Sequence, residues 1–245
     1  MKQAGSRADR LLGAVLAGGA GRRFGGDKTA AEVGGVSMIR RAAGALEEVC
    51  QEVVVVSSRD GTPEGPWRRV PDLRPGRGPL AGMEAALTEA GRLWPDSASA
   101  VFVLAADLPL VGPETAARLA EAYRAGEAEV WAVAAGARPG EVGTRRPPGL
   151  DYEPLCAIYD VRCLEAATRL LDQDRSAARE LFTEVRGTVV EVGDAETFLN
   201  VNTREDAERV RGILAHRAGG ILAEGVEGIL RERSGAMPGR GEGES

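Results

Sequence analysis

The chain has 245 residues, of which 43% are hydrophobic and 28% are charged, and its formal net charge is −6 at pH 7. This length fits one α/β domain, or a domain with an appendage, and the apolar content suffices for a substantial core. The acidic balance argues against a general nucleic-acid surface, and no apolar run approaches the length of a membrane span. Because the polar start Met1–Arg7 also lacks the apolar stretch of a secretory signal, we expect a cytoplasmic protein without nucleic-acid or membrane partners.

Apolar runs alternate with segments of helical spacing along the chain. In chain order, the expected elements are a strand over Leu11–Leu16, a helix over Met38–Val49, strands over Glu52–Val56 and Trp67–Val70, a helix over Leu80–Leu93, a strand over Ala100–Ala105, a helix over Glu114–Ala125, strands over Val130–Ala135 and Ala157–Tyr159, helices over Val161–Leu171 and Ala177–Glu184, a strand over Thr188–Val192 and a helix over Thr203–Leu214. Such alternation predicts an α/β fold with a mostly parallel, doubly wound sheet. We expect this domain to span residues 10–214, followed by a C-terminal helix and flexible tail over 215–245.

Cysteine and histidine content narrows the possible chemistry. Cys50, Cys156 and Cys163 are odd in number and show no Cys-x-x-Cys spacing, which is typical of reduced, structural thiols. His216 is the only histidine, so a zinc site is not expected and a histidine-based catalytic triad is excluded.

The first predicted strand runs directly into a loop rich in glycine and cations. The loop Gly18–Lys28 contains five glycines, and Arg22 and Lys28 supply positive charge. Glycine lets the backbone amides approach a ligand closely, so the loop predicts phosphate binding, with a solvated turn as the alternative. Lys28 follows Asp27 and not glycine, which excludes a Walker A loop, and the spacing also departs from the dinucleotide fingerprint.

Two aspartates follow later strands. Ligands of open parallel sheets bind at the carboxyl ends of the strands, where the loop Gly18–Lys28, Asp72 and Asp107 all fall. From position alone, Asp107 is equally a Mg²⁺ ligand or a turn residue, and for Asp72 the alternative to a ligand contact is an exposed turn residue after Pro71.

Five segments resemble, in the same order, segments of the molybdenum cofactor guanylyltransferases. They are Leu16–Lys28, Pro75–Met83, Ala105–Leu110, Glu153–Tyr159 and Phe198–Asp206. The first and third are shared with sugar nucleotidyltransferases, but together with the last they are specific. The resemblance covers residues 11–212 and implies a Rossmann-like nucleotidyltransferase fold.

The resemblance also implies roles for individual residues. The implied catalytic residues are Lys28, Arg22 and Asp107, with Asp107 also the ligand of a Mg²⁺ cofactor. The implied nucleotide-binding residues are Leu16, Ala17, Gly18, Gly19, Lys28, Ser57, Asp72 and Asp107. Pterin binding is implied for Asn200, Asn202 and Thr203, although Thr203 and Asp206 also fit a capping box at the start of a helix.

The implied reaction is transfer of GMP from GTP to the terminal phosphate of molybdopterin, with release of pyrophosphate. Proteins that deliver molybdopterin and accept the finished cofactor are the implied protein partners. The family usually has asparagine after the second strand, where this chain has Ser57 and Ser58. A CTP-dependent molybdopterin cytidylyltransferase, a sugar-phosphate nucleotidyltransferase and a catalytically silent nucleotide-binding module therefore remain as alternatives.

Overall fold

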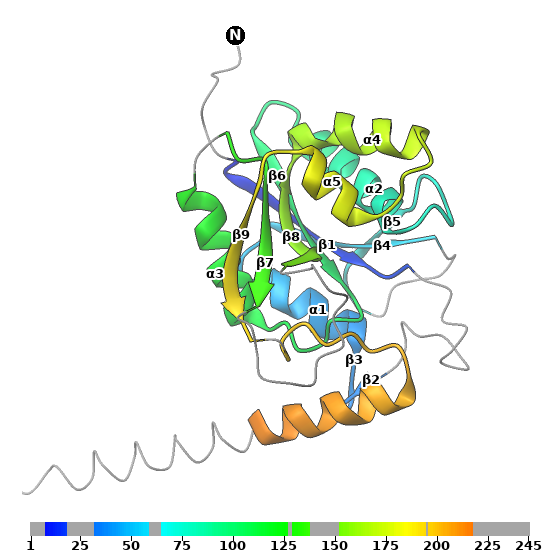
Figure 1. Ribbon diagram of the computed structural model, residues 1–245, viewed down its shortest axis with the longest axis vertical. Coiled ribbons are helices and arrows are strands. Elements are labelled where there is room, and N and C mark those ends of the chain that lie inside the picture. Colours follow the sequence, from blue (N-terminus) through cyan, green and yellow to red (C-terminus); the bar gives the residue numbers. More distant parts are fainter. Residues whose placement is uncertain are drawn as a thin grey trace, which may run out of the picture.

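The structure, a computed structural model, describes residues 8–18, 32–58, 65–126, 129–137, 152–194 and 196–217. Seven of its strands form one sheet in the order β5-β4-β1-β6-β8-β7-β9 (Figure 1). These strands are β1 (Arg10–Leu16), β4 (Glu52–Ser57), β5 (Arg68–Pro71), β6 (Ser99–Ala105), β7 (Ala132–Ala137), β8 (Tyr152–Asp160) and β9 (Gly187–Gly193). A separate hairpin pairs β2 (Glu32–Val33) with β3 (Val36–Ser37).

The sheet is mostly parallel, as the sequence predicts. Strands β5, β4, β1 and β6 pair in parallel, and so do β7 and β9. Only β8 runs in the opposite direction, because it pairs antiparallel with both β6 and β7. The carboxyl ends of the other six strands therefore face one edge of the sheet.

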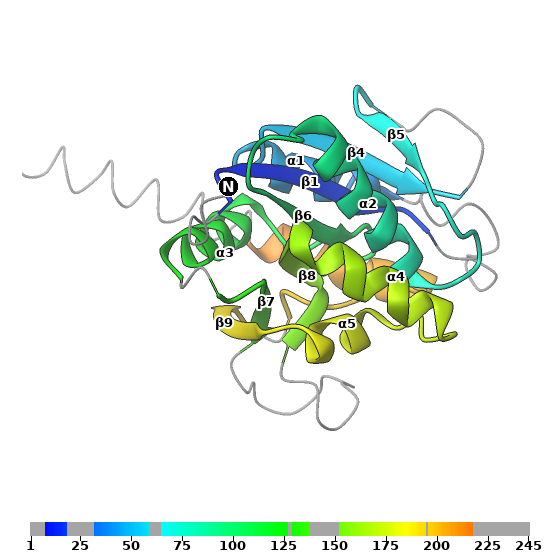
Figure 2. The same cartoon turned by 90° about the horizontal axis from the view of Figure 1, so that it is seen from above.

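Helices cover both faces of the sheet (Figure 2). They are α1 (Met38–Glu47), α2 (Pro79–Leu93), α3 (Pro113–Ala125), the short 3₁₀ helix η2 (Val161–Cys163), α4 (Leu164–Asp172), α5 (Ala178–Glu184) and a last helix over 204–217. Alternate residues of β1 enter separate cores: Leu11 and Val15 pack on the face of α1 and α3, whereas Leu12 and Ala14 pack on the face of α2, α4 and α5. This confirms the doubly wound architecture.

Two features differ from the sequence-based expectation. The strand expected over Ala157–Tyr159 has nine residues, Tyr152–Asp160, because it is stabilised by pairing on both of its edges, which is a non-local effect. The hairpin β2–β3 was not expected, since each of its strands has only two residues. Its turn is formed by Gly34 and Gly35, whose φ angles are +61° and +74°, a conformation that glycine adopts without steric cost.

A small third core lies beyond the carboxyl edge. Val33 of β2 and Met38 of α1 pack there with Val201 and with Val210 of the helix over 204–217. The segment after β9 therefore returns to the hairpin β2–β3 and docks beside it (Figure 1). Within the described ranges, no helix is long and apolar enough to cross a membrane.

Candidate active site

The ends of four parallel strands bring the predicted nucleotide-binding residues to one edge of the sheet. Leu16, the last residue of β1, is paired with Val56 of β4 on one side and with Ala105 of β6 on the other. The Ala17 N–H then donates to the Val56 carbonyl over 2.9 Å, so the chain leaves the sheet between these two neighbours. Gly18 follows and is exposed, as a backbone that approaches a ligand must be.

Asp72 lies at the same edge, directly after β5. Ser57 at the end of β4 is in register with Pro71, and the Ser57 carbonyl accepts a hydrogen bond from the Asp72 N–H over 3.4 Å. The Asp72 side chain is half-buried, and its Oδ1 accepts a hydrogen bond from the Arg74 N–H over 2.9 Å. The carboxylate is thus oriented by the backbone of the following loop.

Asp107 follows β6 and is joined to the late Asn200–Thr203 segment. Its side chain is half-buried, and its backbone carbonyl accepts a hydrogen bond from the Val201 N–H over 2.9 Å. This bond places exposed Asn200 and exposed Asn202 on either side of a residue that is attached to Asp107. The segments Ala105–Leu110 and Phe198–Asp206, which are far apart in the sequence, therefore lie next to each other in the fold.

Thr203 caps the last helix. Its hydroxyl oxygen accepts from the Asp206 N–H over 3.1 Å, and the Asp206 carboxylate accepts from the Thr203 N–H over 2.8 Å. The same carboxylate accepts from the Asn202 N–H over 2.9 Å. These reciprocal bonds confirm the capping box, and the bond from the Asn202 N–H extends it to the preceding residue.

The second glycine-rich segment brings α2 close to the end of β1. A Cβ atom at Gly82 would lie 3.3 Å from Leu16 Cδ2, so glycine permits the close approach of helix and strand. At Gly78, φ is +76° and a Cβ atom would lie 3.1 Å from the Ser176 carbonyl oxygen, so a side chain there is disfavoured twice. Pro79 then starts α2 in the position where its missing N–H costs no helical hydrogen bond.

Several predicted site residues lie outside the described residues, namely Gly19, Arg22 and Lys28. Sequence reasoning in turn overlooked Arg74 and Glu84, whose side chains pair with each other; the backbone N–H of Arg74 is the donor to the Asp72 carboxylate. The sequence does contain a signal for this pair, since Glu84 stands among the apolar residues of Leu80–Leu87. A charged side chain on a buried helix face requires an oppositely charged partner.

The donor chemistry of this edge fits Mg²⁺. Among the described residues, no group of three or more His, Cys, Asp or Glu side chains is arranged to hold a metal ion. Mg²⁺ does not require one, since it is commonly bound by one or two carboxylates together with phosphate oxygens and water. The half-buried Asp107 carboxylate at the strand end is a hard oxygen donor of this kind.

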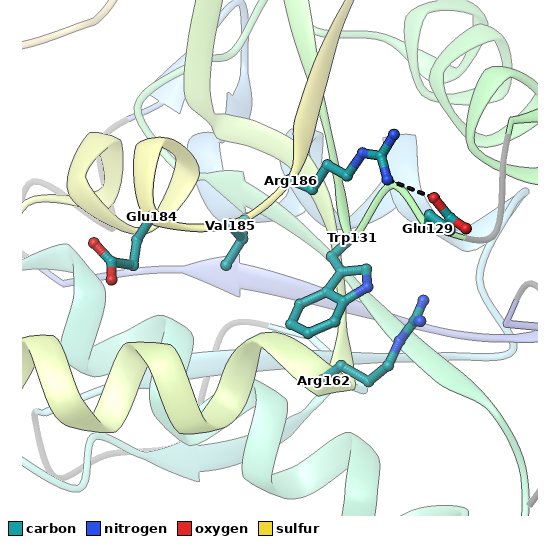
Figure 3. A pocket seen from close by; sticks show the side chains of 6 residues that line it. All are labelled: Glu129, Trp131, Arg162, Glu184, Val185 and Arg186. Carbon is teal, nitrogen blue, oxygen red and sulfur yellow. Dashed lines mark hydrogen bonds and ion pairs between the residues drawn. The ribbon is translucent and has the colours of Figure 1, made fainter. Parts of the chain in front are cut away.

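A cavity of about 500 Å³ lies at the opposite end of the sheet (Figure 3). It is lined by Glu129, Trp131, Arg162, Glu184, Val185 and Arg186. Trp131 precedes β7 and Arg186 precedes β9, so the cavity is near the amino ends of these strands. Each of its four charged side chains forms an ion pair within the protein, which leaves no unneutralised charge for a phosphate.

Comparisons with known proteins bear on the family to which the chain belongs. A family model described as "MobA-like NTP transferase domain" matches residues 13–189. A "Probable molybdenum cofactor guanylyltransferase" from Pelotomaculum thermopropionicum is 34% identical over 211 residues, which cover 82% of this chain and 92% of the relative. A "Molybdenum cofactor guanylyltransferase" from Desulfosudis oleivorans is 29% identical, with 84% of this chain and 96% of the relative covered.

A solved structure is similar in fold. The molybdopterin-guanine dinucleotide biosynthesis protein A from Archaeoglobus fulgidus gives a TM-score of 0.62 at 24% identity, with 84% of this chain and 99% of that chain covered. The family match extends from β1 into β9 and thus includes the strand ends that carry Leu16, Ser57 and Asp107. The chain therefore belongs to the MobA-like NTP transferase family, and it is a nucleotidyltransferase.

Proposed function

We propose that this enzyme transfers GMP from GTP to the terminal phosphate of molybdopterin. The hydrogen bond between the Val201 N–H and the Asp107 carbonyl carries the proposal, because it joins a candidate metal carboxylate to a segment rich in amide side chains. Asparagine amides both donate and accept hydrogen bonds, which suits the polar edge of a pterin. The names of the relatives support the same acceptor and donor.

The reaction is an in-line displacement at phosphorus. An oxygen of the molybdopterin phosphate attacks the α-phosphorus of GTP. The bond between this phosphorus and the oxygen that bridges it to the β-phosphorus breaks, and pyrophosphate leaves. Such a transfer requires little covalent chemistry from the protein, so alignment and charge stabilisation carry the catalysis. Mg²⁺, when bound, supplies positive charge to the phosphate oxygens.

The residues of the carboxyl edge divide this work. The backbone of Leu16, Ala17 and Gly18, with that of Gly19, binds the nucleotide at the end of β1. Asp107 holds the metal ion, and Lys28 with Arg22 neutralises the phosphates. Ser57 and Asp72 contact the nucleoside portion from the neighbouring strand ends.

Asn200, Asn202 and Thr203 orient the pterin on the other side of Asp107. Because the pterin cofactor is passed on between proteins, we also propose transient contacts with a protein that delivers molybdopterin and with one that accepts the product.

CTP is the second candidate donor. The observation that favours it is Ser57 at the end of β4, where guanylyltransferases of this type usually have asparagine. A serine hydroxyl donates and accepts hydrogen bonds through the same oxygen atom, whereas an asparagine amide has separate donor and acceptor groups. The hydroxyl therefore discriminates less between the hydrogen-bonding edges of different bases.

The test incubates the enzyme and Mg²⁺ with metal-loaded molybdopterin and GTP, CTP, ATP or UTP in separate reactions. Pyrophosphate release and the mass of the pterin product are followed. Turnover with GTP alone supports the proposal, and turnover with CTP moves the enzyme to the cytidylyl reaction. Parallel reactions with sugar phosphates as acceptors test the remaining alternative, and no product with any pair would refute molybdopterin and sugar phosphates alike as acceptors.

A further inference from the structure

A buried glutamate on α2 forms a network that ends at the candidate nucleotide site. Glu84 lies in the second turn of α2 and is 4% exposed, so it cannot reach a ligand. Its carboxylate accepts two hydrogen bonds from Arg74, from Nε to Oε2 over 3.0 Å and from Nη2 to Oε1 over 3.1 Å. This two-point pairing fixes the plane of the guanidinium group as well as its position.

Arg74 is held from a second direction by the end of α4. Its Nη1 donates to Asp172 Oδ1 over 2.6 Å. The pKa of Arg74 is raised by the hydrogen bond to Asp172 and by the charge of Glu84, so its cationic form is favoured further. The neighbouring Arg77 donates to the Leu171 carbonyl over 2.7 Å, which ties the same loop to α4 once more.

The restraint on Arg74 is transmitted to Asp72. The backbone N–H of Arg74 donates to Asp72 Oδ1 over 2.9 Å, so fixing Arg74 also fixes the direction of this carboxylate. External support matters here because β5 is an edge strand of four residues, and among the described strands it pairs with β4 alone.

We propose that Glu84 is a positioning residue, which acts through Arg74 to orient Asp72 for the nucleotide. The inference rests on the proposed function, in which Asp72 contacts the nucleotide. It adds a residue that never touches substrate and yet determines how tightly the nucleotide binds.

Glu89 provides a matched control on the same helix. It is 9% exposed and, like Glu84, pairs with arginine, namely with Arg68 and with Arg92, each over 2.6 Å. Arg68 begins β5 and Arg92 is in the last turn of α2, so both lie away from Asp72. Glu89→Gln therefore removes a comparable buried charge without reaching the site.

The experiment measures the Kd of GTP by calorimetry in the absence of acceptor, together with KM and kcat in the full reaction. We expect Glu84→Gln to raise Kd and KM about five- to tenfold, which corresponds to the net contribution of one ordinary hydrogen bond. We expect kcat at saturating GTP to fall less than threefold, and Glu89→Gln to change Kd less than twofold. If Glu84→Gln fails to fold, Arg74→Lys is used, since it keeps the charge but loses the two-point pairing.

A double-substitution cycle separates positioning from general damage. In an Asp72→Asn background, Glu84→Gln should raise Kd no further, because the residue through which it acts is already changed. Two results would overturn this inference and leave the proposed function intact. In one, the fold-increase in Kd of the double variant equals the product of the two single fold-increases. In the other, Asp72→Asn weakens GTP binding while Glu84→Gln leaves Kd unchanged. An unchanged Kd in Asp72→Asn itself would instead refute the role of Asp72 in the proposed function, and the inference with it.

Discussion

Replacing Gly13 or Gly44 by alanine should change stability in opposite directions, although the two residues lie on elements that pack against each other. A Cβ atom at Gly13 in β1 would lie 3.0 Å from Val53 Cγ2 and 3.1 Å from Leu46 Cβ. The Cys50 Sγ would lie 3.2 Å away. A Cβ atom at Gly44 in α1 would meet no atom of the described structure within 4 Å.

The magnitudes follow from these distances. Overfilling a packed core costs about 1–3 kcal/mol, and replacing glycine within a strand returns about 0.5–1 kcal/mol. At the middle of these two ranges, Gly13→Ala should therefore lower the free energy of unfolding by about 1.3 kcal/mol. Gly44→Ala gains helix propensity without a contact and should raise it by about 0.5–1 kcal/mol.

Urea unfolding followed by circular dichroism measures both changes. With a slope of about 3 kcal/mol per molar urea, the midpoint should fall by roughly 0.4 M for Gly13→Ala and rise by roughly 0.2–0.3 M for Gly44→Ala. A Gly13→Ala protein as stable as the unaltered chain would show that α1 can move away from β1 at little cost. The reasoning from close packing would then be refuted.

Three further predictions concern the site, acid stability and the thiols. Asp107→Asn should lower nucleotidyl transfer by about 10²-fold or more with an unchanged urea midpoint, and a loss below tenfold would count against Asp107 as metal ligand. The pKa of Glu89 is lowered, chiefly by its hydrogen bond to Arg92. The ionised Glu89 carboxylate therefore stabilises the fold above pH 4.5, and this stabilisation is lost as the pH falls through the lowered pKa. The difference between the urea midpoints at pH 6 and pH 3.5 should accordingly be smaller for Glu89→Gln than for the unaltered chain. Burial raises the pKa of Cys156 and of Cys163, so neither thiol should react with iodoacetamide at pH 8 until the protein unfolds, as peptide mass mapping would detect.

The strands buried on both faces were predictable from the sequence because their signal is local. β1, β4 and β6 are continuous apolar runs, and each was predicted to within one residue at either end. β8 was underestimated because its first half contains Glu153 and Pro154, and only pairing with β7 makes that half a strand. The hairpin β2–β3 had a readable signal, since Gly34-Gly35 between two valines is typical of a tight turn.

The candidate site was predictable as a set of strand ends but not as a set of contacts. Parallel strands place their carboxyl ends together, so Asp72 and Asp107 could be assigned to one edge without a structure. The bond from Val201 to Asp107 depends on where the chain returns after β9, which no local pattern encodes. Thr203 is the exception, because a capping box is a short-range motif and the structure confirms it.

The two buried glutamates of α2, Glu84 and Glu89, each pair with an arginine, but the two pairs differ in what they hold in place. A carboxylate on the buried face of a helix must be paired with a cation, and here each pairing reaches β5 or the loop that follows it. Glu89 binds Arg68 at the start of β5, and Glu84 binds Arg74 just beyond its end, so α2 holds this edge strand at both ends. Only the attachment through Glu84 and Arg74 adjoins a residue of the candidate site, namely Asp72. Replacing Glu84 or Glu89 by glutamine should therefore lower stability equally, whereas only the Glu84 variant should lose nucleotide affinity.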